Sequence, residues 1–338
     1  MKYSFIVPVY NRPDEVDELL ESLTHQHIKD FEVVIVEDGS KVPCKDIVDK
    51  YADQMKISYY FKSNSGPGMS RNYGAERAEG EYFIVLDSDC VIPEGYLDAV
   101  EAELQREPAD AWGGPDHAHA SFTDTQKAIN YSMTSFFTTG GIRGGKKKMD
   151  KFYPRSFNMG IKASLYRELN GFSKMRFGED IDFSIRIYKA SARCRLFPEA
   201  WVWHKRRTDM KKFYRQVYNF GIARINLYKK YPESLKLVHM LPMVFTVGVY
   251  SLLIALIVGL VMQLWWLVIV ALCPIVLYSL IILIDSSCKN KSLKIGMISI
   301  RAAFIQLMGY GMGFIVAWWR RCVMGRDEFN AYQKNFYK

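Results

Sequence analysis

Residues 82–89 read Tyr-Phe-Ile-Val-Leu-Asp-Ser-Asp, an apolar run that ends in two carboxylates one residue apart. The run 82–86 has the length and character of a buried strand, and the Ile-Pro-Glu-Gly at 92–95 is turn-like. Asp87 and Asp89 would then lie at the carboxyl edge of a sheet, where a hard divalent cation that bridges phosphate oxygens can bind. The stretch predicts a cation and diphosphate site.

Short apolar runs alternate with helical patterns over residues 1–205, and 82–86 is the fourth such run. Residues 4–10, 31–36 and 57–61 precede it, and all three are rich in β-branched or aromatic side chains. This alternation is typical of a parallel sheet with helices on both faces. We therefore expect an α/β domain.

Polar residues follow the second and third predicted strands. Glu37 and Asp38 come directly after the second, where a carboxylate can bind a nucleotide base or ribose hydroxyls. Asp38 is also suited to capping the next helix. After the third, Gly66 and Arg71 belong to a glycine-rich segment that opens a helix, and its free N–H groups and guanidinium favour an anion.

The apolar residues of this 338-residue chain concentrate at its C-terminal end. Residues 243–262 and 264–283 contain no charged side chain, and each is long enough to cross roughly 30 Å of hydrocarbon as a helix. They predict a tight transmembrane hairpin. A third stretch, 295–319, is apolar but contains Arg301, Gln306 and four glycines, so it is suited to spanning, re-entering or lying in the interface.

The net charge of +9 favours an anionic partner, and the two apolar stretches favour membrane lipids over nucleic acid. Six cysteines are scattered without a C-x-x-C spacing, which argues against a zinc site and fits reduced thiols. Residues 1–3 lead straight into the first strand rather than into a signal peptide. We expect a multi-pass protein of the cytoplasmic membrane, inner or plasma, with its N-terminal domain in the cytoplasm.

Charges around the third stretch bear on topology. With the N-terminal domain inside, the hairpin returns the chain to the cytoplasm at Lys289 and Lys294, as the positive-inside tendency prefers. If residues 295–319 then crossed fully, Arg320 and Arg326 would lie outside. The charge rule therefore favours an interfacial or re-entrant helix, although a third span stays open.

Four short sequences stand in order in the N-terminal half, and a second set follows. They are Val-Pro-Val-Tyr-Asn-Arg at 7–12, Val-Glu-Asp-Gly-Ser at 36–40, Gly-Pro-Gly-Met-Ser-Arg-Asn at 66–72, Asp-Ser-Asp at 87–89, Asn-Met-Gly at 158–160, Asn-Gly-Phe at 170–172 and Gly-Glu-Asp-Ile-Asp at 178–182. The first four resemble the nucleotide-sugar half of an inverting family-2 glycosyltransferase of the GT-A fold, and the later three resemble its acceptor-side motifs. His204 falls where the family's late metal-binding histidine is expected. The resemblance covers roughly residues 2–230 and implies a Rossmann-like, mostly parallel mixed sheet.

The resemblance also implies roles for single residues. Donor binding is expected of Pro8, Tyr10, Asn11, Glu37, Asp38, Gly66, Arg71, Asn72, Asp87, Ser88 and Asp89, and acceptor binding of Gly113, Gly114, Asn158, Met159 and Gly160. Asp89, with help from Asp87 and His204, is expected to hold Mn²⁺ or Mg²⁺, which stabilises the charge on the leaving diphosphate. A packed core histidine is the alternative for His204.

Inversion by direct displacement needs a base that takes the proton from the acceptor hydroxyl. Asp180 is the predicted base, with Glu179 as the second catalytic residue. The alternative is ordinary acidic capping at a helix N-terminus. Asp182 is expected to pair with Arg186 or to orient its neighbours.

Basic residues concentrate in two further segments, 209–231 and 140–148. Residues 209–231 form an amphipathic pattern with many cations, which predicts an interfacial helix. Processive relatives carry Gln-x-x-Arg-Trp here, whereas residues 216–220 read Gln-Val-Tyr-Asn-Phe, which argues against polymer synthesis. The basic loop 140–148 is equally suited to being a lid, a phosphate clamp or a solvated loop. His117 and His119 have the H-x-H form of a metal pair but lie in an irregular stretch, and they are not expected to bind metal.

The predicted domains are a GT-A domain over 1–208, an interfacial helix over 209–236, a transmembrane hairpin over 237–285, and a third membrane-associated helix with a tail over 286–338. The predicted activity is metal-dependent, inverting transfer of one sugar from a nucleotide-sugar donor, UDP- or GDP-linked, to a lipid-linked or membrane-proximal acceptor. The alternatives are a polyprenyl-phosphate sugar synthase, a nucleotidyltransferase and an inactive nucleotide-binding scaffold.

Overall fold

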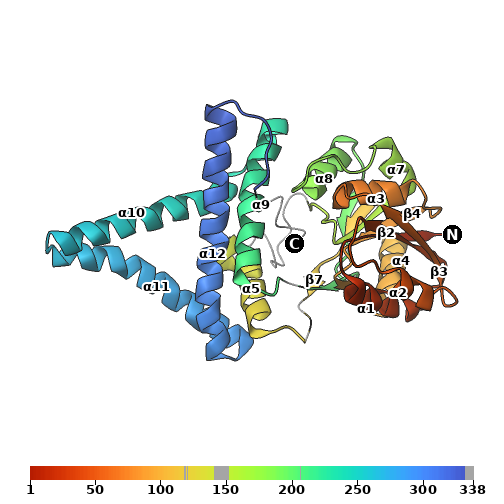
Figure 1. The fold of residues 1–338 in the computed structure, drawn as a ribbon, viewed down its shortest axis with the longest axis horizontal. Coiled ribbons are helices and arrows are strands. Elements are labelled where there is room, and N and C mark those ends of the chain that lie inside the picture. The colour runs from red at the N-terminus through yellow and green to blue at the C-terminus, as the bar shows by residue number, and fades with distance from the viewer. Residues whose placement is uncertain (118, 120, 141–151, 206, 332–338) are drawn as a thin grey trace. The chain divides into compact units, whose positions relative to one another are not determined.

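The computed structural model describes residues 1–117, 119, 121–140, 152–205 and 207–331. The chain divides into two compact units (Figure 1). The first is Met1–His119 with Lys148–Lys205, and the second is Ala120–Lys147 with Arg206–Lys338. A segment inside the predicted catalytic domain thus belongs to the helical unit.

A seven-stranded mixed sheet forms the centre of the first unit. In spatial order its strands are β3 (Lys56–Lys62), β2 (Phe31–Asp38), β1 (Tyr3–Val9), β4 (Tyr82–Leu86), β8 (Asn158–Lys162), β6 (Ala111–Gly113) and β9 (Cys194–Leu196). The first four are parallel, and β8 runs antiparallel to both of its neighbours. The expected α/β class with a mostly parallel mixed sheet is confirmed.

Helices cover both faces of this sheet. The apolar residues of α1 (Pro13–Thr24), α2 (Lys45–Lys50) and α4 (Tyr96–Arg106) belong to one core cluster with the inward side chains of β1 and β2. On the other face, α3 (Pro67–Ala75), α7 (Ala163–Glu168) and α8 (Glu179–Lys189) contribute to a second cluster. Because both faces are buried, the central strands carry runs of consecutive apolar residues, such as 33–36 in β2 and 82–86 in β4, rather than alternating apolar and polar residues.

A small three-stranded sheet completes the first unit. In it β10 (Val202–His204) lies between β5 (Cys90–Val91) and β7 (Asp116–His117). The antiparallel pairing of β10 with β5 sets His204 opposite Cys90. Two polar positions more than one hundred residues apart are thereby brought together.

The second unit is helical. It contains α5 (Asp124–Thr134), α6 (Phe136–Thr139), α9 (Met210–Lys230), the short 3₁₀ turns η1 (Pro232–Ser234) and η2 (Leu237–Met240), α10 (Leu241–Val261), α11 (Trp265–Asn290), α12 (Leu293–Trp318) and the π-helical turn η3 (Trp319–Val323). Among the described residues, three helical stretches are long and apolar enough to cross a membrane, Leu237–Val261, Trp265–Asn290 and Leu293–Val323. Membrane association is therefore a property of this unit.

Glycines bring the helices of this unit into close contact. The glycines of α12 contact both the hairpin and α9. A Cβ on Gly311 would lie 2.4 Å from the Pro242 carbonyl oxygen on α10, but one on Gly313 would lie 2.0 Å from the Tyr218 carbonyl oxygen on α9. Gly309 also faces α9, whereas Gly296 packs on Leu283 and Ser287 of α11, so the glycines are divided between α9 and the hairpin.

Candidate functional site

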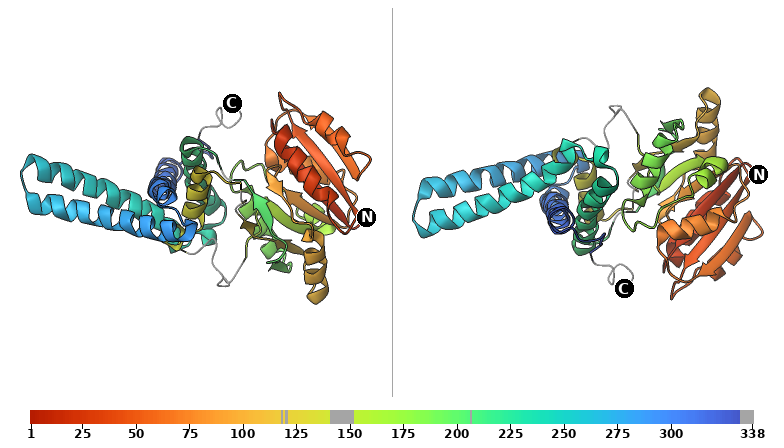
Figure 2. Two further views of the ribbon diagram at one scale, coloured as in Figure 1. Left: turned by 90° about the horizontal axis from the view of Figure 1, so that it is seen from below. Right: turned by 90° about the horizontal axis from the view of Figure 1, so that it is seen from above.

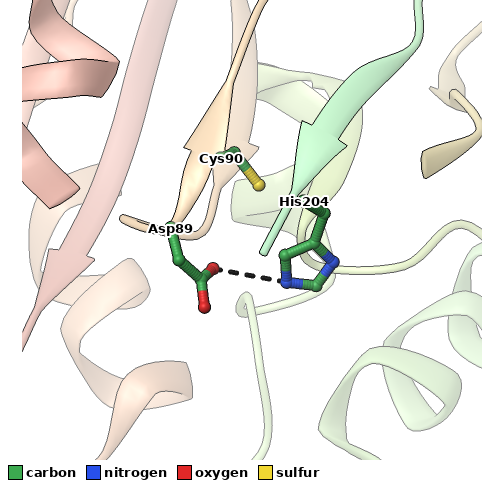
Figure 3. A group of neighbouring side chains, drawn as sticks. All are labelled: Asp89, Cys90 and His204. Atoms are coloured by element: carbon green, nitrogen blue, oxygen red, sulfur yellow. Dashed lines mark ion pairs between the residues drawn. The ribbon is translucent and has the colours of Figure 1, made fainter. Parts of the chain in front are cut away.

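The Asp-Ser-Asp turn connects β4 to β5 and places Asp89 beside His204. The Oδ1 atom of Asp89 lies 3.3 Å from Nε2 of His204, and Cys90 stands next to both (Figure 3). One ligand atom from each of the three residues lies within 4.8 Å of the others. Strand pairing of β5 with β10 produces this group, which single motifs do not reveal.

The group fits a hard divalent cation through two of its members. Burial raises the pKa of the Cys90 thiol well above its ordinary value, and sulfur is a soft donor that a hard cation disfavours. A carboxylate oxygen and an imidazole nitrogen remain, which is a donor set suited to Mn²⁺ and acceptable to Mg²⁺. The His204 ring stacks on Phe157 at a centroid distance of 4.8 Å, and Asp116 Oδ2 lies 3.9 Å from His204 Nδ1.

Arg12 occupies the other oxygen of the same carboxylate. Its Nη1 atom donates to Asp89 Oδ2 at 2.8 Å and to Glu15 Oε2 at 2.6 Å. The sequence motif at 7–12 includes this arginine, but the residue pattern alone gave it no role. A guanidinium at this position adds positive charge where a diphosphate would bind.

Asp87 takes a different partner. Arg71, buried on α3, donates from Nη2 to Asp87 Oδ1 at 2.5 Å and from Nη1 to Glu179 Oε1 at 3.3 Å. The structure thus does not bring Asp87 into the group of Asp89 and His204. Instead the arginine links the Asp-Ser-Asp turn to the first residue of α8.

The N-terminus of α8 carries the two predicted catalytic residues. Burial and the neighbouring Asp180 carboxylate raise the pKa of Glu179 to about 7, against the opposing effect of Arg71. Asp180 is 17% exposed at its side chain and accepts from Arg155 Nη1 at 3.0 Å. Arg155 was not predicted, because it precedes β8 in an irregular stretch without a motif.

Asp182 pairs with Arg186 as expected, and Arg186 makes further hydrogen bonds. Arg186 pairs with Asp182 at 3.0 Å and also donates to the carbonyl oxygens of Leu169 and Gly171. The Asn-Gly-Phe motif is therefore tied to α8 through main-chain contacts.

The carboxylates after β2 organise loops. Asp38 accepts from the main-chain N–H groups of Ser65 at 2.8 Å and Gly66 at 2.9 Å, and also binds Lys62. It does not cap the next helix, because the N-cap residue of α2 is Cys44 and makes no side-chain cap. The carboxylate fixes the glycine-rich segment that leads into α3.

Glu37 and Asn11 likewise hold the neighbouring loop through side-chain hydrogen bonds. Glu37 is fully buried and accepts from the Cys44 N–H at 2.8 Å and from the Ser40 hydroxyl. Asn11 has a φ of 52° and its Oδ1 accepts from the Lys41 N–H at 2.7 Å. These contacts order the carboxyl edges of β1 and β2, where a donor is expected.

The other predicted donor residues line the same edge or support it. Pro8 and Tyr10 are half-buried at the end of β1, and Ser88 is buried in the turn. Asn72 donates to the Phe172 carbonyl oxygen and accepts from the Phe172 N–H, both at 2.8 Å. Its side chain joins α3 to the Asn-Gly-Phe motif; donor contact remains a prediction for all four.

The residues predicted to bind the acceptor lie within the sheet. Asn158 and Met159 are fully buried, and the Asn158 amide binds Tyr96 Oη and the Ala200 carbonyl oxygen. Gly160 is required sterically, because a Cβ there would lie 1.9 Å from the Trp112 ring. The remaining two are Gly113, which ends β6, and Gly114, where a Cβ would lie 1.7 Å from the same Ala200 oxygen. These contacts explain the motif through packing, and acceptor contact stays a prediction.

Two other predictions concern loops. His117 stacks on Trp201 at 4.6 Å and His119 lies edge-on to Trp203 at 5.5 Å, so these rings pack against aromatic side chains. Neither belongs to the metal-ligand group formed by the described residues. Of the basic loop 140–148, residues 141–148 lie outside the described residues.

Comparison with known proteins identifies the family of the N-terminal half. The family model described as "Glycosyl transferase family 2" matches residues 4–170. An uncharacterized glycosyltransferase of Rickettsia felis is 38% identical over 104 residues, 31% of this chain and 17% of that protein. The Staphylococcus aureus poly(ribitol-phosphate) beta-N-acetylglucosaminyltransferase TarS is 38% identical over 114 residues, 32% of this chain and 20% of TarS. The matches to these two relatives thus span a fifth or less of their length.

Among solved structures, the mannosyltransferase PcManGT of Pyrobaculum calidifontis, determined with GDP-Man and Mn²⁺, has a TM-score of 0.58 at 14% identity. The likeness covers 95% of this chain and 88% of that one. It shows the fold, and the GT-A architecture expected from the sequence is confirmed.

Proposed function

This chain belongs to glycosyl transferase family 2 through its N-terminal half, and on that premise we propose that it transfers a single sugar, with inversion, from a nucleotide-sugar donor to an acceptor at the membrane. The observation that carries the proposal is the continuous chain of contacts from Asp87 through Arg71 to Glu179. It joins the turn that would meet the donor diphosphate to the helix that presents the base.

Donor departure is the first chemical requirement. A divalent cation bound by Asp89 Oδ1 and His204 Nε2 would neutralise charge that develops on the leaving diphosphate. Arg12, beside the same carboxylate, adds a second positive group. The His204 ring stacks on Phe157 with its Nε2 atom 3.3 Å from Asp89 Oδ1.

Acceptor activation is the second requirement. The Asp180 carboxylate takes the proton from the acceptor hydroxyl as that oxygen attacks the anomeric carbon opposite the diphosphate. Arg155 donates to this carboxylate at 3.0 Å and orients it. Glu179, buried behind it, shares Arg71 with Asp87 and thereby fixes the first turn of α8.

The acceptor is proposed to be lipid-linked. Three apolar helices follow the catalytic residues in the chain, and an enzyme held at a bilayer meets membrane-bound acceptors at high local concentration. We place the catalytic unit on the cytoplasmic face, where nucleotide sugars are made. The lack of an Arg-Trp pair at 219–220 supports single transfer rather than polymerisation.

Purified full-length protein in lipid nanodiscs tests this proposal. It is incubated with a panel of UDP- and GDP-sugars, with Mn²⁺, Mg²⁺ or EDTA, and release of the nucleoside diphosphate is measured. One donor class should release its diphosphate only with a metal and only in the wild type, compared with Asp89→Ala. A folded protein that neither binds nor cleaves any donor would show that the chain is an inactive scaffold.

A further inference from the structure

The third apolar helix lies in a different direction from the first two. Helix α12 runs side by side with α9, and the α10–α11 hairpin extends crosswise from this pair (Figure 1). Seen along the α9–α12 pair, the two helices are viewed end-on while the hairpin lies flat in the page (Figure 2). The three apolar helices are therefore not three parallel spans.

We infer that only α10 and α11 cross the bilayer, and that α12 lies with α9 in the plane of the membrane surface. Lipid covers the exposed sides of α10 and α11, because little of either helix is buried by other parts of the protein. In the most apolar part of each hairpin helix only 17% is buried inside the protein, compared with 44% in the most apolar part of the stretch that contains α12. At 1.5 Å per residue, the 21 residues of α10 reach roughly 31 Å, which matches the hydrocarbon thickness.

Helix α9 fixes the depth of its neighbour. It is not among the helices apolar enough to span, within the described chain, and it exposes lysines at both ends, Lys211 and Lys212 at one and Lys229 and Lys230 at the other. Such a helix belongs in the headgroup region. A Cβ on Gly221 of α9 would lie 2.1 Å from the Tyr310 carbonyl oxygen, so the two backbones touch and share one depth.

The side chains of α12 agree with this placement. The stripe made by Met297, Arg301, Met308 and Trp319 follows one side of the helix, since these residues are four, seven and eleven positions apart. Arg301 is exposed, and in a spanning helix it would lie roughly 12 Å beyond Leu293, inside the hydrocarbon. The most apolar part of the stretch Leu293–Val323, which contains α12, has a mean hydropathy of 1.4, compared with 2.6 and 3.0 for the stretches of α10 and α11.

The charges at the two ends of α12 and the tryptophans at the tip of the hairpin also fit this placement. Lys289 and Lys294 precede or open α12, and Arg320 and Arg326 follow it. An in-plane helix keeps both groups on one anionic face, as the positive-inside tendency requires. At the far end of the hairpin Trp265 and its neighbour Trp266 are 66% and 62% exposed, as expected at the opposite interface.

Depth measurements by spin labelling test this inference on the full chain. Single labels replace Met297 or Met308 on α12 or Trp319 at the start of η3, and in a matched series Ile269, Val276 or Ile284 on α11. The background replaces the four cysteines that are not fully buried with serine. The accessibility of each spin label to molecular oxygen and to a water-soluble nickel reagent is then compared in nanodiscs of phosphatidylethanolamine and phosphatidylglycerol.

The α11 series should be deepest at Val276 and shallow at its ends. The α12 series should report one shallow depth at all three positions. A Met308 label much deeper than the labels at Met297 and Trp319 would overturn the inference. As a second readout, tags in the 289–294 turn and at the C-terminus should be protected or cleaved together in sealed vesicles; tags on opposite sides would contradict it equally.

Discussion

Asp89 is held between two cationic or cation-binding groups, with Arg12 on one oxygen and His204 facing the other. Replacing it with alanine removes an anionic ligand and leaves the guanidinium without this partner. We expect Asp89→Ala to abolish transfer and to weaken Mn²⁺ binding, measured by calorimetry, while the thermal unfolding temperature without metal changes little. Full activity of the variant in metal-free buffer would refute the assignment.

Asp180 separates binding from chemistry. Asparagine at this position keeps the size of the side chain but cannot accept a proton. We predict that Asp180→Asn lowers turnover by roughly 10²–10⁴ and leaves donor affinity within about a few-fold. Turnover rates and donor binding isotherms decide the matter, because a loss of affinity with unchanged turnover would make Asp180 a binding residue.

Glu179 gives a pH dependence with a definite sign. Its pKa is raised, first by burial, to about 7 from an ordinary value of 4.5. The stability that this group contributes is therefore fully present below about pH 4.5 and is lost as the pH rises through about 7. The free energy of unfolding of the wild type should fall over this range relative to Glu179→Gln, and parallel curves would contradict the prediction.

At this scale the sequence identified the charged residues but not their pairing. Asp89 and His204 were predicted to share a cation, and the structure brings them together. Asp87 was included because it is adjacent, and only the position of Arg71 in space shows that it has another partner. Arg12 and Arg155 were missed for the same reason, since their partners lie 77 and 25 residues away.

At the scale of elements, the predicted strand 82–86 matches β4, and the strands at 31–36 and 57–61 each extend by one or two residues. These segments were predictable because buried parallel strands are continuously apolar. The small sheet was not, because its strands β5 and β7 are two residues long and carry no periodic signal. That α5 belongs to the helical unit was also invisible, since its apolar face does not specify its partner.

The contact of α9 with α12 supplies an element-scale prediction. Alanine at Gly313 would place its Cβ 2.0 Å from the Tyr218 carbonyl oxygen, so the helices must separate. We expect Gly313→Ala to destabilise the helical unit by about 1–3 kcal/mol. The matched control is Gly248→Ala on α10, where nothing lies within 4 Å and alanine should be neutral or slightly stabilising. Equal thermal stability of both variants in detergent would disprove close packing.

At the scale of the whole molecule, the two units are interleaved along the chain. Ala128 and Ile129 of α5 and Phe213 of α9 share a core cluster with Ile295 and Ala302 of α12. A chain cut after residue 231 loses the last two and exposes the others. We expect it to aggregate, whereas a chain that ends at 205 and has residues 120–147 replaced by a short linker should be soluble. Size-exclusion profiles compare the two, and a monodisperse product of the simple truncation would contradict the division.

The central claim is sugar transfer to a membrane-bound acceptor, and mass spectrometry of lipid-linked saccharides tests it most directly. Membranes are compared from cells that express the wild type, Asp180→Asn or no protein. We expect a lipid species heavier by one sugar residue in the wild type alone, with its unglycosylated precursor accumulating in the other two. Identical lipid profiles in all three, with the wild type folded and in the membrane, would contradict it.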